Sequence, residues 1–247
     1  MIYITGDTHG DYDIEKIDKI KTRLTPSDYI IICGDFGAYW SWSNDFLEEE
    51  DNPAHYADEK LKKFYSSFPC TILWIDGNHE NFELIDKLPT EHKFNGYVHR
   101  CWSNCYHLIR GQTYVIDGIT IFAFGGAESL DKMSRIPYVS WWEREMPNEA
   151  EMQMGLANLE ALGGKVDIIL SHDAPAWWCE EYYNNPIVNI LNKYFDHIYQ
   201  TYEWGWWFFG HHHIDECFSD NLLCCVYNKF VTVKNTDGRI SFDFTSF

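Results

Sequence analysis

Positive charge is scarce in this sequence: 19 lysines and arginines stand against 38 aspartates and glutamates, and the net charge at pH 7 is −19. A protein that follows a long nucleic acid normally presents a basic face, so we expect no long nucleic-acid partner. An anionic substrate would have to be attracted by a local feature, such as bound metal ions, rather than by the field of the whole protein.

Two further features are lacking. No apolar run is long enough to cross a bilayer, and the N-terminus shows no basic region followed by an apolar stretch and a cleavage site. We therefore expect a cytoplasmic location and no membrane association.

Several of the eight cysteines lie in apolar runs, as Cys33 does, so we expect reduced cysteines that act as small core side chains. Cys101 and Cys105 lack the second cysteine pair that a structural zinc site needs.

The sequence also lacks internal repeats and long linkers, which favours a single domain over residues 1–247. Hydrophobic residues make up 45%, enough for a sizeable core. Apolar runs that end in short polar clusters predict strands. These runs are Ile2–Thr5, Tyr29–Cys33, Thr71–Ile75, Val166–Leu170 and Trp206–Phe209.

Segments with helical spacing of apolar residues alternate with these strands. They are Tyr12–Arg23, Ala54–Phe68, Asn148–Leu162 and Ile187–Tyr199. Gly111–Phe124 and Cys224–Phe244 resemble antiparallel strand pairs, the second with a turn at 235–238. This alternation predicts an α/β domain with mixed sheets, in which polar clusters at the carboxyl ends of strands form the site.

The polar clusters contain residue types that bind metals. Asp7 and His9 lie two positions apart, as do His211 and His213, and extended backbone would point each pair to one side and His212 away. Carboxylate oxygen and imidazole nitrogen bind borderline divalent metals such as manganese, iron and zinc. The glycines before these clusters allow tight turns.

Five motifs in this order resemble the calcineurin-like metallophosphoesterases. They are Asp-x-His from Asp7, Gly-Asp at Asp35, Gly-Asn-His-Glu around Asn78, a later His172, and Gly-His-x-His ending at His213. The resemblance covers residues 5 to 213. It implies two mixed β-sheets packed as a sandwich, flanked by helices, and a metal-dependent phosphoric ester hydrolase with two divalent ions, for which manganese is expected first and iron, zinc, magnesium, nickel or cobalt are alternatives.

The resemblance also assigns ligands. Asp7, His9, Asp35 and His213 would hold the first ion, and Asp35, Asn78, His172 and His211 the second, with Asp35 bridging both. A shared carboxylate and hydroxide would screen two cations about 3.5–4 Å apart. We hypothesise that this bridging hydroxide attacks the phosphorus of a monoester or diester. His79 resembles the family's non-ligand histidine, which would donate a proton or hydrogen bond to the leaving oxygen.

The sequence departs from the protein-phosphatase branch of the family after Asp35. An arginine that grips phosphate is expected there, but the chain continues as Phe-Gly-Ala-Tyr-Trp, which puts serine/threonine phosphatase activity in doubt. Arg135 and Lys132, which follow a glycine-rich segment, are candidate substrate-binding residues, since arginine binds phosphate through two parallel hydrogen bonds. The alternative is a surface loop with ordinary charges.

Other residues are open to two interpretations. Tryptophans after the motifs could stack on a nucleobase at the rim of a pocket or pack in the core, which is the commoner case, and four of them are the better candidates for the rim. These are Trp40, Trp42, Trp177 and Trp178. Asp11 and Asp13 fit the capping of a helix. Asp173 and Glu80 could orient a histidine or lie in solvent.

Two rival classes remain. A metallo-β-lactamase-like hydrolase fits poorly, because its His-x-His cluster comes near the first strands, whereas here it comes last. A non-catalytic scaffold of the same fold would show missing ligands, and none is missing. The substrate we expect is a small, nucleotide-like phosphate compound. The sequence does not indicate the oligomeric state.

Overall fold

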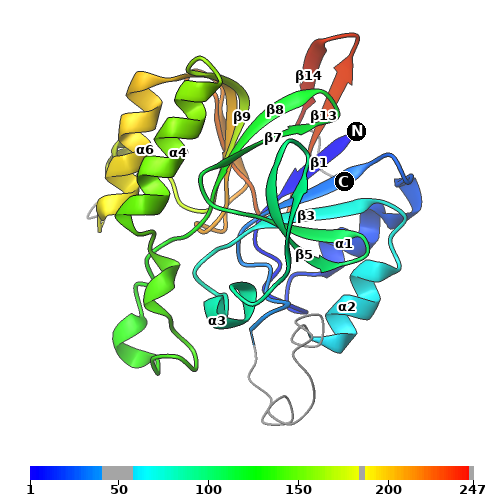
Figure 1. The fold of residues 1–247 in the computed structure, drawn as a ribbon, viewed down its shortest axis with the longest axis horizontal. Coiled ribbons are helices and arrows are strands. Elements are labelled where there is room, and N and C mark those ends of the chain that lie inside the picture. Colours follow the sequence, from blue (N-terminus) through cyan, green and yellow to red (C-terminus); the bar gives the residue numbers. More distant parts are fainter. Residues whose placement is uncertain (41–57, 184–186, 245–247) are drawn as a thin grey trace.

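Two β-sheets face each other, and helices cover the outer face of each (Figure 1). The fold is that of a computed structural model, which describes residues 1–40, 58–183 and 187–244. One sheet has eight strands in the order β14-β13-β1-β2-β3-β6-β5-β4, and the other has six in the order β11-β12-β10-β9-β8-β7. This confirms the predicted sandwich of mixed sheets with flanking helices.

The strands have the following bounds. The first sheet contains β1 (Ile2–Thr5), β2 (Tyr29–Cys33), β3 (Thr71–Ile75), β4 (Thr90–Lys93), β5 (Gly96–Trp102), β6 (Cys105–Leu108), β13 (Val231–Thr236) and β14 (Arg239–Asp243). The second contains β7 (Gln112–Ile116), β8 (Ile119–Phe124), β9 (Lys165–Ser171), β10 (Glu203–Phe209), β11 (Glu216–Phe218) and β12 (Leu223–Cys225).

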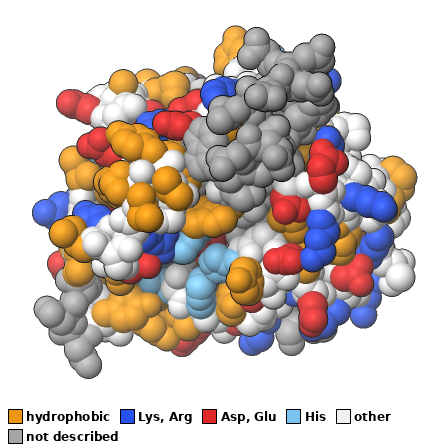
Figure 2. Space-filling view, turned by 90° about the horizontal axis from the view of Figure 1, so that it is seen from below, with side chains coloured by type: hydrophobic (Ala, Val, Ile, Leu, Met, Phe, Trp, Pro, Cys, Tyr) orange, Lys and Arg blue, Asp and Glu red, His pale blue; other side chains and the backbone are white. Residues whose placement is uncertain are grey.

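Parallel pairing brings the polar clusters to one edge of the molecule. Strands β1, β2 and β3 run parallel at the centre of the first sheet, and β8, β9 and β10 run parallel in the second. Their carboxyl ends therefore open on the same side, where parallel sheets place their sites. Figure 2 looks onto this edge and shows histidine side chains at the surface beside a gathering of hydrophobic side chains.

Four of the six described α-helices lie largely within segments predicted to be helical, and the other two were not predicted. The helices are α1 (Glu15–Ile20), α2 (Glu59–Ser66), α3 (Phe82–Ile85), α4 (Glu149–Ala161), α5 (Ala176–Tyr182) and α6 (Ile190–Thr201), with the short 3₁₀ turns η1 (Lys21–Arg23), η4 (Lys132–Ser134) and η5 (Glu143–Glu145). Helix α4 begins in a capping box of Asn148 with Glu151, and Asp58 caps α2. Part of the predicted helix Ala54–Phe68, together with Trp42, lies outside the described residues.

Three layers of buried apolar side chains hold the elements together. One lies between the sheets and contains alternate residues of the central strands, such as Ile4, Ile31 and Phe208. A second packs α1, α2 and α3 against the first sheet, and the third packs α4, α5 and α6 against the second. Because both faces of the central strands are covered, those strands are continuous apolar runs in the sequence.

The expectation that every cysteine is reduced is wrong for one pair. Cys217 on β11 and Cys224 on β12 lie directly opposite each other in antiparallel register and are joined by a disulfide. The other six of the eight cysteines are free and buried, as expected for small core side chains. Of the helices in the described ranges, none has the length and hydrophobicity that a membrane crossing requires.

Candidate metal centre

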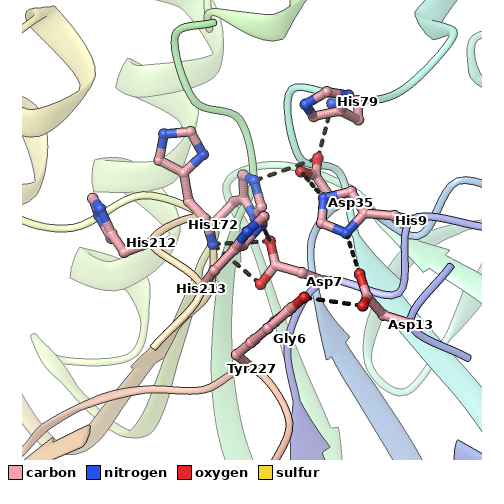
Figure 3. A network of polar contacts seen from close by, with 12 residues as sticks. Gly6, Asp7, His9, Asp13, Asp35, His79, His172, His212, His213 and Tyr227 are labelled. Carbon is pink, nitrogen blue, oxygen red and sulfur yellow. Dashed lines mark hydrogen bonds and ion pairs between the residues drawn. The ribbon is translucent and has the colours of Figure 1, made fainter. Parts of the chain in front are cut away.

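The predicted ligands converge at the carboxyl ends of strands from both sheets. Asp7 follows β1, Asp35 follows β2, and Asn78 follows β3 in the first sheet, while His172 follows β9 in the second. The two histidines His211 and His213 follow β10. Figure 3 shows Asp7, Asp35, His172 and His213 turned toward one another beyond the ends of the strands.

The carboxylate of Asp35 lies at the middle of this group. Its Oδ2 is 3.2 Å from His9 Nε2, and its Oδ1 is 3.4 Å from His172 Nε2. Asp35 is only 1% exposed, so its charge is shielded from water. One carboxylate thus faces a ligand from each predicted set, which is the geometry that a bridging role requires.

Donor atoms cluster in threes around Asp35 and Asp7. Atoms of Asp7, His9 and His213 lie within 4.8 Å of one another, and so do atoms of Asp7, Asp35 and His172. The first trio corresponds to the predicted first ion. Asp7 contributes to both, because it is fully buried between them and accepts hydrogen bonds from the backbone N–H of His211.

The remaining ligands of the predicted second ion lie on the inner side. Asn78 Oδ1 is 3.2 Å from His172 Nε2, so the amide oxygen faces the centre. The ring of His211 lies 5.1 Å from that of His172, centroid to centroid, but its nitrogens join none of the close donor trios found among the described residues. His211 therefore lies next to the predicted set with its ring farther from the other donors.

The backbone at these positions differs from the expected one. Asp7, His9, Asp35, His211 and His213 all have positive φ, between 35° and 64°, whereas extended backbone was predicted for the two Asp-x-His and His-x-His pairs. The strands end before the motifs, so each of these five ligands lies in a tight left-handed turn. Such conformations are sparsely populated and persist where the surrounding structure enforces them, which is typical of functional sites.

Three glycines make room for the ligand side chains. A Cβ on Gly34 would lie 2.0 Å from His172 Nδ1, and one on Gly77 would lie 2.0 Å from Asp35 Oδ1. A Cβ on Gly210 would come within 2.4 Å of Asp7 Oδ2. Each of these three glycines is thus required by the close approach of a ligand side chain, and Gly34 also by its positive φ of +90°.

The carboxylates give the site a strong attraction for positive charge. Burial acts to lower the pKa of His9, but the hydrogen bond and charge of Asp35 raise it to about 9. Burial opposes the charged form of His172 as well, yet Asp35 raises its pKa to about 10. His211, farther from Asp35, has its pKa lowered by burial to about 4. Divalent cations in this position would satisfy the same carboxylates that hold these protons.

His79 and Arg135 lie together at the opening of the site. The backbone N–H of His79 donates to Asp35 Oδ1 over 2.8 Å, and its Nε2 lies 3.1 Å from Arg135 Nη2. Burial lowers the pKa of His79, Asp35 opposes that shift, and the charge of Arg135 adds to it. Arg135 thus contacts His79 as well as forming an ion pair with Asp131, whereas Lys132 forms an ion pair with Glu128.

Of the three predicted rim tryptophans that lie in the described residues, only Trp40 lines the site. Trp40 lies 5.3 Å from the ring of His79, and both line a cavity of about 610 Å³ that also contacts His9 and His213. Trp178 is only 2% exposed and Trp177 packs on Tyr199, so the rim assignment is wrong for these two. Their helix α5 covers the second sheet instead of the site.

The capping role expected for Asp11 and Asp13 is also wrong. The residue that caps α1 is Ile14, and no side chain caps that helix. Asp11 forms an ion pair with Lys60 over 2.7 Å. Asp13 instead contacts His9 Nδ1 over 2.8 Å. The four-residue spacing of His9 and Asp13 was the signal that could have revealed this contact.

Asp173 and Glu80 do not lie in solvent. Glu80 is fully buried and accepts the backbone N–H of Phe36, and burial, together with the charge of Asp35, raises its pKa well above the usual range. Asp173 Oδ1 lies 3.2 Å from Nε2 of His212, the histidine expected to face away from the ligands.

The sequence did not indicate the support of Asn78. Its Nδ2 donates to Ser129 Oγ over 3.1 Å, and that hydroxyl donates to Glu145 over 2.6 Å. This chain of hydrogen bonds turns the Asn78 oxygen toward His172. Glu145 lies 67 positions after Asn78, and no local pattern connects the two.

Comparison with known proteins gives the family of this chain. The family model for calcineurin-like phosphoesterases matches residues 1–215. The chain belongs to the calcineurin-like phosphoesterase family. Phosphoric ester hydrolysis, the class of activity that gives this family its name, is the one that the sequence predicted. All seven predicted ligands lie inside the matched range.

Individual relatives of this calcineurin-like phosphoesterase share less than a third of their aligned residues with it. The chain is 28% identical over 188 residues to a lariat debranching enzyme of Drosophila melanogaster. It is 29% identical over 188 residues to the lariat debranching enzyme of Drosophila pseudoobscura pseudoobscura. Each alignment covers 70% of this chain and 33% of the relative. The chain thus matches about a third of their length. A putative 5'-nucleotidase from Staphylococcus aureus, solved with alpha-ketoglutarate, aligns with a TM-score of 0.49 and 12% identity over 98% of this chain and 52% of that one.

Proposed function

We propose that this chain is a dinuclear metal-dependent phosphoesterase that hydrolyses a phosphate monoester or diester. The observation that carries the proposal is the position of Asp35, whose two oxygens face His9 on one side and His172 on the other at 3.2 and 3.4 Å. A carboxylate between two sets of donors is what a pair of neighbouring cations requires.

The donor set fits two divalent ions. It combines two carboxylates, four imidazoles and one amide oxygen, which suit manganese, with iron, zinc, magnesium, nickel or cobalt as alternatives. Two carboxylates do not neutralise two dications, so the loaded site would retain positive charge. That local charge would attract a phosphate to a protein whose net charge is −19.

The reaction would divide between the ions and the side chains around them. When bound, the two cations lower the pKa of a water molecule and neutralise charge on the phosphoryl oxygens. His79, held by its backbone bond to Asp35, would present its ring to the leaving oxygen and donate a proton or hydrogen bond. Arg135 would bind a phosphoryl oxygen beside it, since its guanidinium reaches the same ring.

We propose a small, nucleotide-like substrate. The cavity beside His9 and His79 has about 610 Å³, a size that accepts a small organic group, and the ring of Trp40 offers it a flat apolar wall. Among the described residues that follow Asp35 up to position 40, none is an arginine, so the phosphate grip of the protein phosphatases is missing there. We further propose that residues 1–247 act as one domain in the cytoplasm.

Metal removal and restoration would test this function. Purified protein would be stripped with a chelator, dialysed and reloaded with Mn²⁺, and bound metal would be counted by mass spectrometry. We expect two ions per chain and hydrolysis of chromogenic phosphate esters that disappears and returns with the metal. A panel of aryl monoester, bis-aryl diester, nucleotide and phosphopeptide would assign the substrate class.

A protein that never binds more than one ion contradicts the dinuclear site. A fully loaded protein that hydrolyses none of these esters supports the scaffold alternative. Cleavage of the phosphopeptide alone would instead identify a protein phosphatase.

A further inference from the structure

Asp13 and Tyr227 form a hydrogen-bonded pair beside the metal centre. The hydroxyl of Tyr227 donates to Asp13 Oδ1 over 2.9 Å, and the other oxygen of Asp13 accepts from His9 Nδ1 over 2.8 Å. The ring of Tyr227 also stacks on that of His213, with centroids 4.7 Å apart and planes 11° from parallel. The pair therefore touches two of the predicted ligands, one through its carboxylate and one through its aromatic ring (Figure 3).

These contacts fix how both histidines present their nitrogens. With Nδ1 donating to Asp13, His9 must offer Nε2 as its free nitrogen, and this atom faces Asp35. A carboxylate behind a histidine also makes the ligand nitrogen more basic. The flat contact with Tyr227 restricts rotation of His213, whose Nε2 lies 3.6 Å from Asp7 Oδ1.

Lys16 anchors the pair from beneath. Its buried ammonium group donates to the backbone carbonyl oxygens of Asp7, over 2.8 Å, of Gly6 and of Tyr227. The segment that carries Tyr227 is thereby tied to the loop that carries Asp7. Tyr227 is consequently held in place by the backbone as well as by its hydroxyl.

The ligands on the other side have a different kind of support. His172 Nδ1 donates to the backbone carbonyl of Cys33 over 2.7 Å, and Asn78 is turned by Ser129. Neither contact involves Asp13 or Tyr227. The side chain of His172 is 0% exposed, whereas that of His213 is 46% exposed.

We propose that Asp13 and Tyr227 are positioning residues that set the metal affinity of the outer position alone, formed by Asp7, His9 and His213. This inference rests on the proposed dinuclear site. The outer ion is then the exchangeable one, because His213 is 46% exposed and both of its histidines are oriented by Asp13 and Tyr227, whereas His172 of the inner set is fully buried. The inner ion, beside His172 and Asn78, keeps its affinity when the pair is removed.

Metal titration of four variants would test the inference. Asp13→Ala removes the carboxylate, Asp13→Asn keeps only a neutral acceptor, Tyr227→Phe removes only the hydroxyl, and Tyr227→Ala removes the ring too. Asp11→Ala and Tyr12→Ala are matched controls from the same loop, since Asp11 pairs with Lys60 and Tyr12 is 87% exposed. Each protein would be titrated with Mn²⁺ by equilibrium dialysis, and the coupling of the two ions would be read by electron paramagnetic resonance.

We expect Asp13→Ala and Tyr227→Ala to weaken one of the two ions about 10–100-fold, the usual effect of removing a group that orients a ligand, and to leave the other unchanged. At limiting Mn²⁺ their spectra would change from a coupled pair to a single ion. Asp13→Asn and Tyr227→Phe should show smaller losses, and the controls should match the wild type. The one ion retained also reports that a variant is folded.

Equal weakening of both ions, or of neither, would overturn the inference while the wild type still binds two. A wild type that cannot bind two ions overturns both this inference and the dinuclear site. Loss in Asp11→Ala equal to that in Asp13→Ala would mean that general charge, not orientation, controls affinity, and would also overturn it.

Discussion

Asp35 and His172 bring the two sheets together at the metal centre: the carboxylate follows β2, the imidazole follows β9, and Oδ1 of the first lies 3.4 Å from Nε2 of the second. Both side chains are buried and neither could be placed by one sheet alone. The site therefore forms only when the two sheets are packed together. Substitutions that disturb this packing should weaken metal binding.

Replacing His79 should separate catalysis from metal content. In His79→Gln the donor to the leaving oxygen is lost, and we expect turnover to fall about 10²–10⁴-fold, the usual contribution of a general acid. Both ions should remain, because His79 is outside the predicted ligand set. Metal counting and kcat on one ester measure the two effects. Loss of an ion in this variant would show that His79 is itself a ligand, a reading that its closeness to His9 and Asp35 allows.

Arg135 and Lys132 should differ in their effect on substrate. Arg135 contacts His79, so Arg135→Ala removes a charge-assisted hydrogen bond of about 1.5–3 kcal/mol and should lower kcat/KM by roughly 10–100-fold. Lys132 pairs with Glu128 and is 41% exposed, so Lys132→Ala should leave kcat/KM within about twofold. Steady-state kinetics on the same ester compares them. The assignment of Arg135 fails if the two variants behave alike.

Gly34 should be irreplaceable for a steric reason. An alanine there would place its Cβ 2.0 Å from His172 Nδ1, so Gly34→Ala should displace the imidazole and remove the inner ion. Gly163 is a matched control, with φ of +77° against +90° and no atom within 4 Å of an added Cβ. Gly163→Ala should lower the free energy of unfolding by only about 1–2 kcal/mol, because alanine disfavours the left-handed backbone conformation there. Thermal unfolding and metal counting distinguish the two, and full metal content in Gly34→Ala would refute the steric role.

The partly buried His99 should make the fold sensitive to acid. Burial lowers its pKa from 6.5 to about 3, and the neighbouring His107 and Arg144 add to the shift while Asp76 opposes it. Between pH 6.5 and 3 the unfolded chain binds this proton and the folded chain does not, so stability falls as the pH falls. The slope is at most about 1.4 kcal/mol per pH unit.

His99→Gln should flatten that slope, and His92→Gln, on the exposed face of β4, should not. Urea unfolding of the metal-free protein at several pH values measures the difference. Parallel slopes for His99→Gln and wild type would contradict the prediction.

The fold was predictable where burial is uniform. Strands β1, β2 and β3 have the predicted bounds. Continuous apolar, β-branched runs such as Tyr29–Cys33 are typical of strands that are buried on both faces of a sheet. Strand β5 was missed, since Gly96–Trp102 mixes histidine and arginine with apolar residues and its outer face is polar. Helix α5 was missed as well, because it has seven residues and begins directly after Pro175.

The sequence motifs predicted the candidate ligands, but they did not predict the residues that hold those ligands in place. Each motif is a short, continuous stretch of sequence, so Asp7 and His9 can be recognised together within three residues. Tyr227 lies 214 positions from Asp13, and nothing in either neighbourhood indicates the hydrogen bond between them. Such pairings depend on how the loops after β1 and β12 meet, which is decided by tertiary packing.

The hydrogen bond that the backbone N–H of His211 donates to the carboxylate of Asp7 joins residues 204 positions apart. During synthesis, Asp7 leaves the ribosome long before β10 and His211 exist, so a nascent chain offers cations only isolated carboxylates and imidazoles. Tight capture must await the last strands of both sheets. At the proposed dinuclear site, metal uptake would therefore be a late event in biogenesis, and a bound pair of ions would mark a chain in which His211 has already reached Asp7.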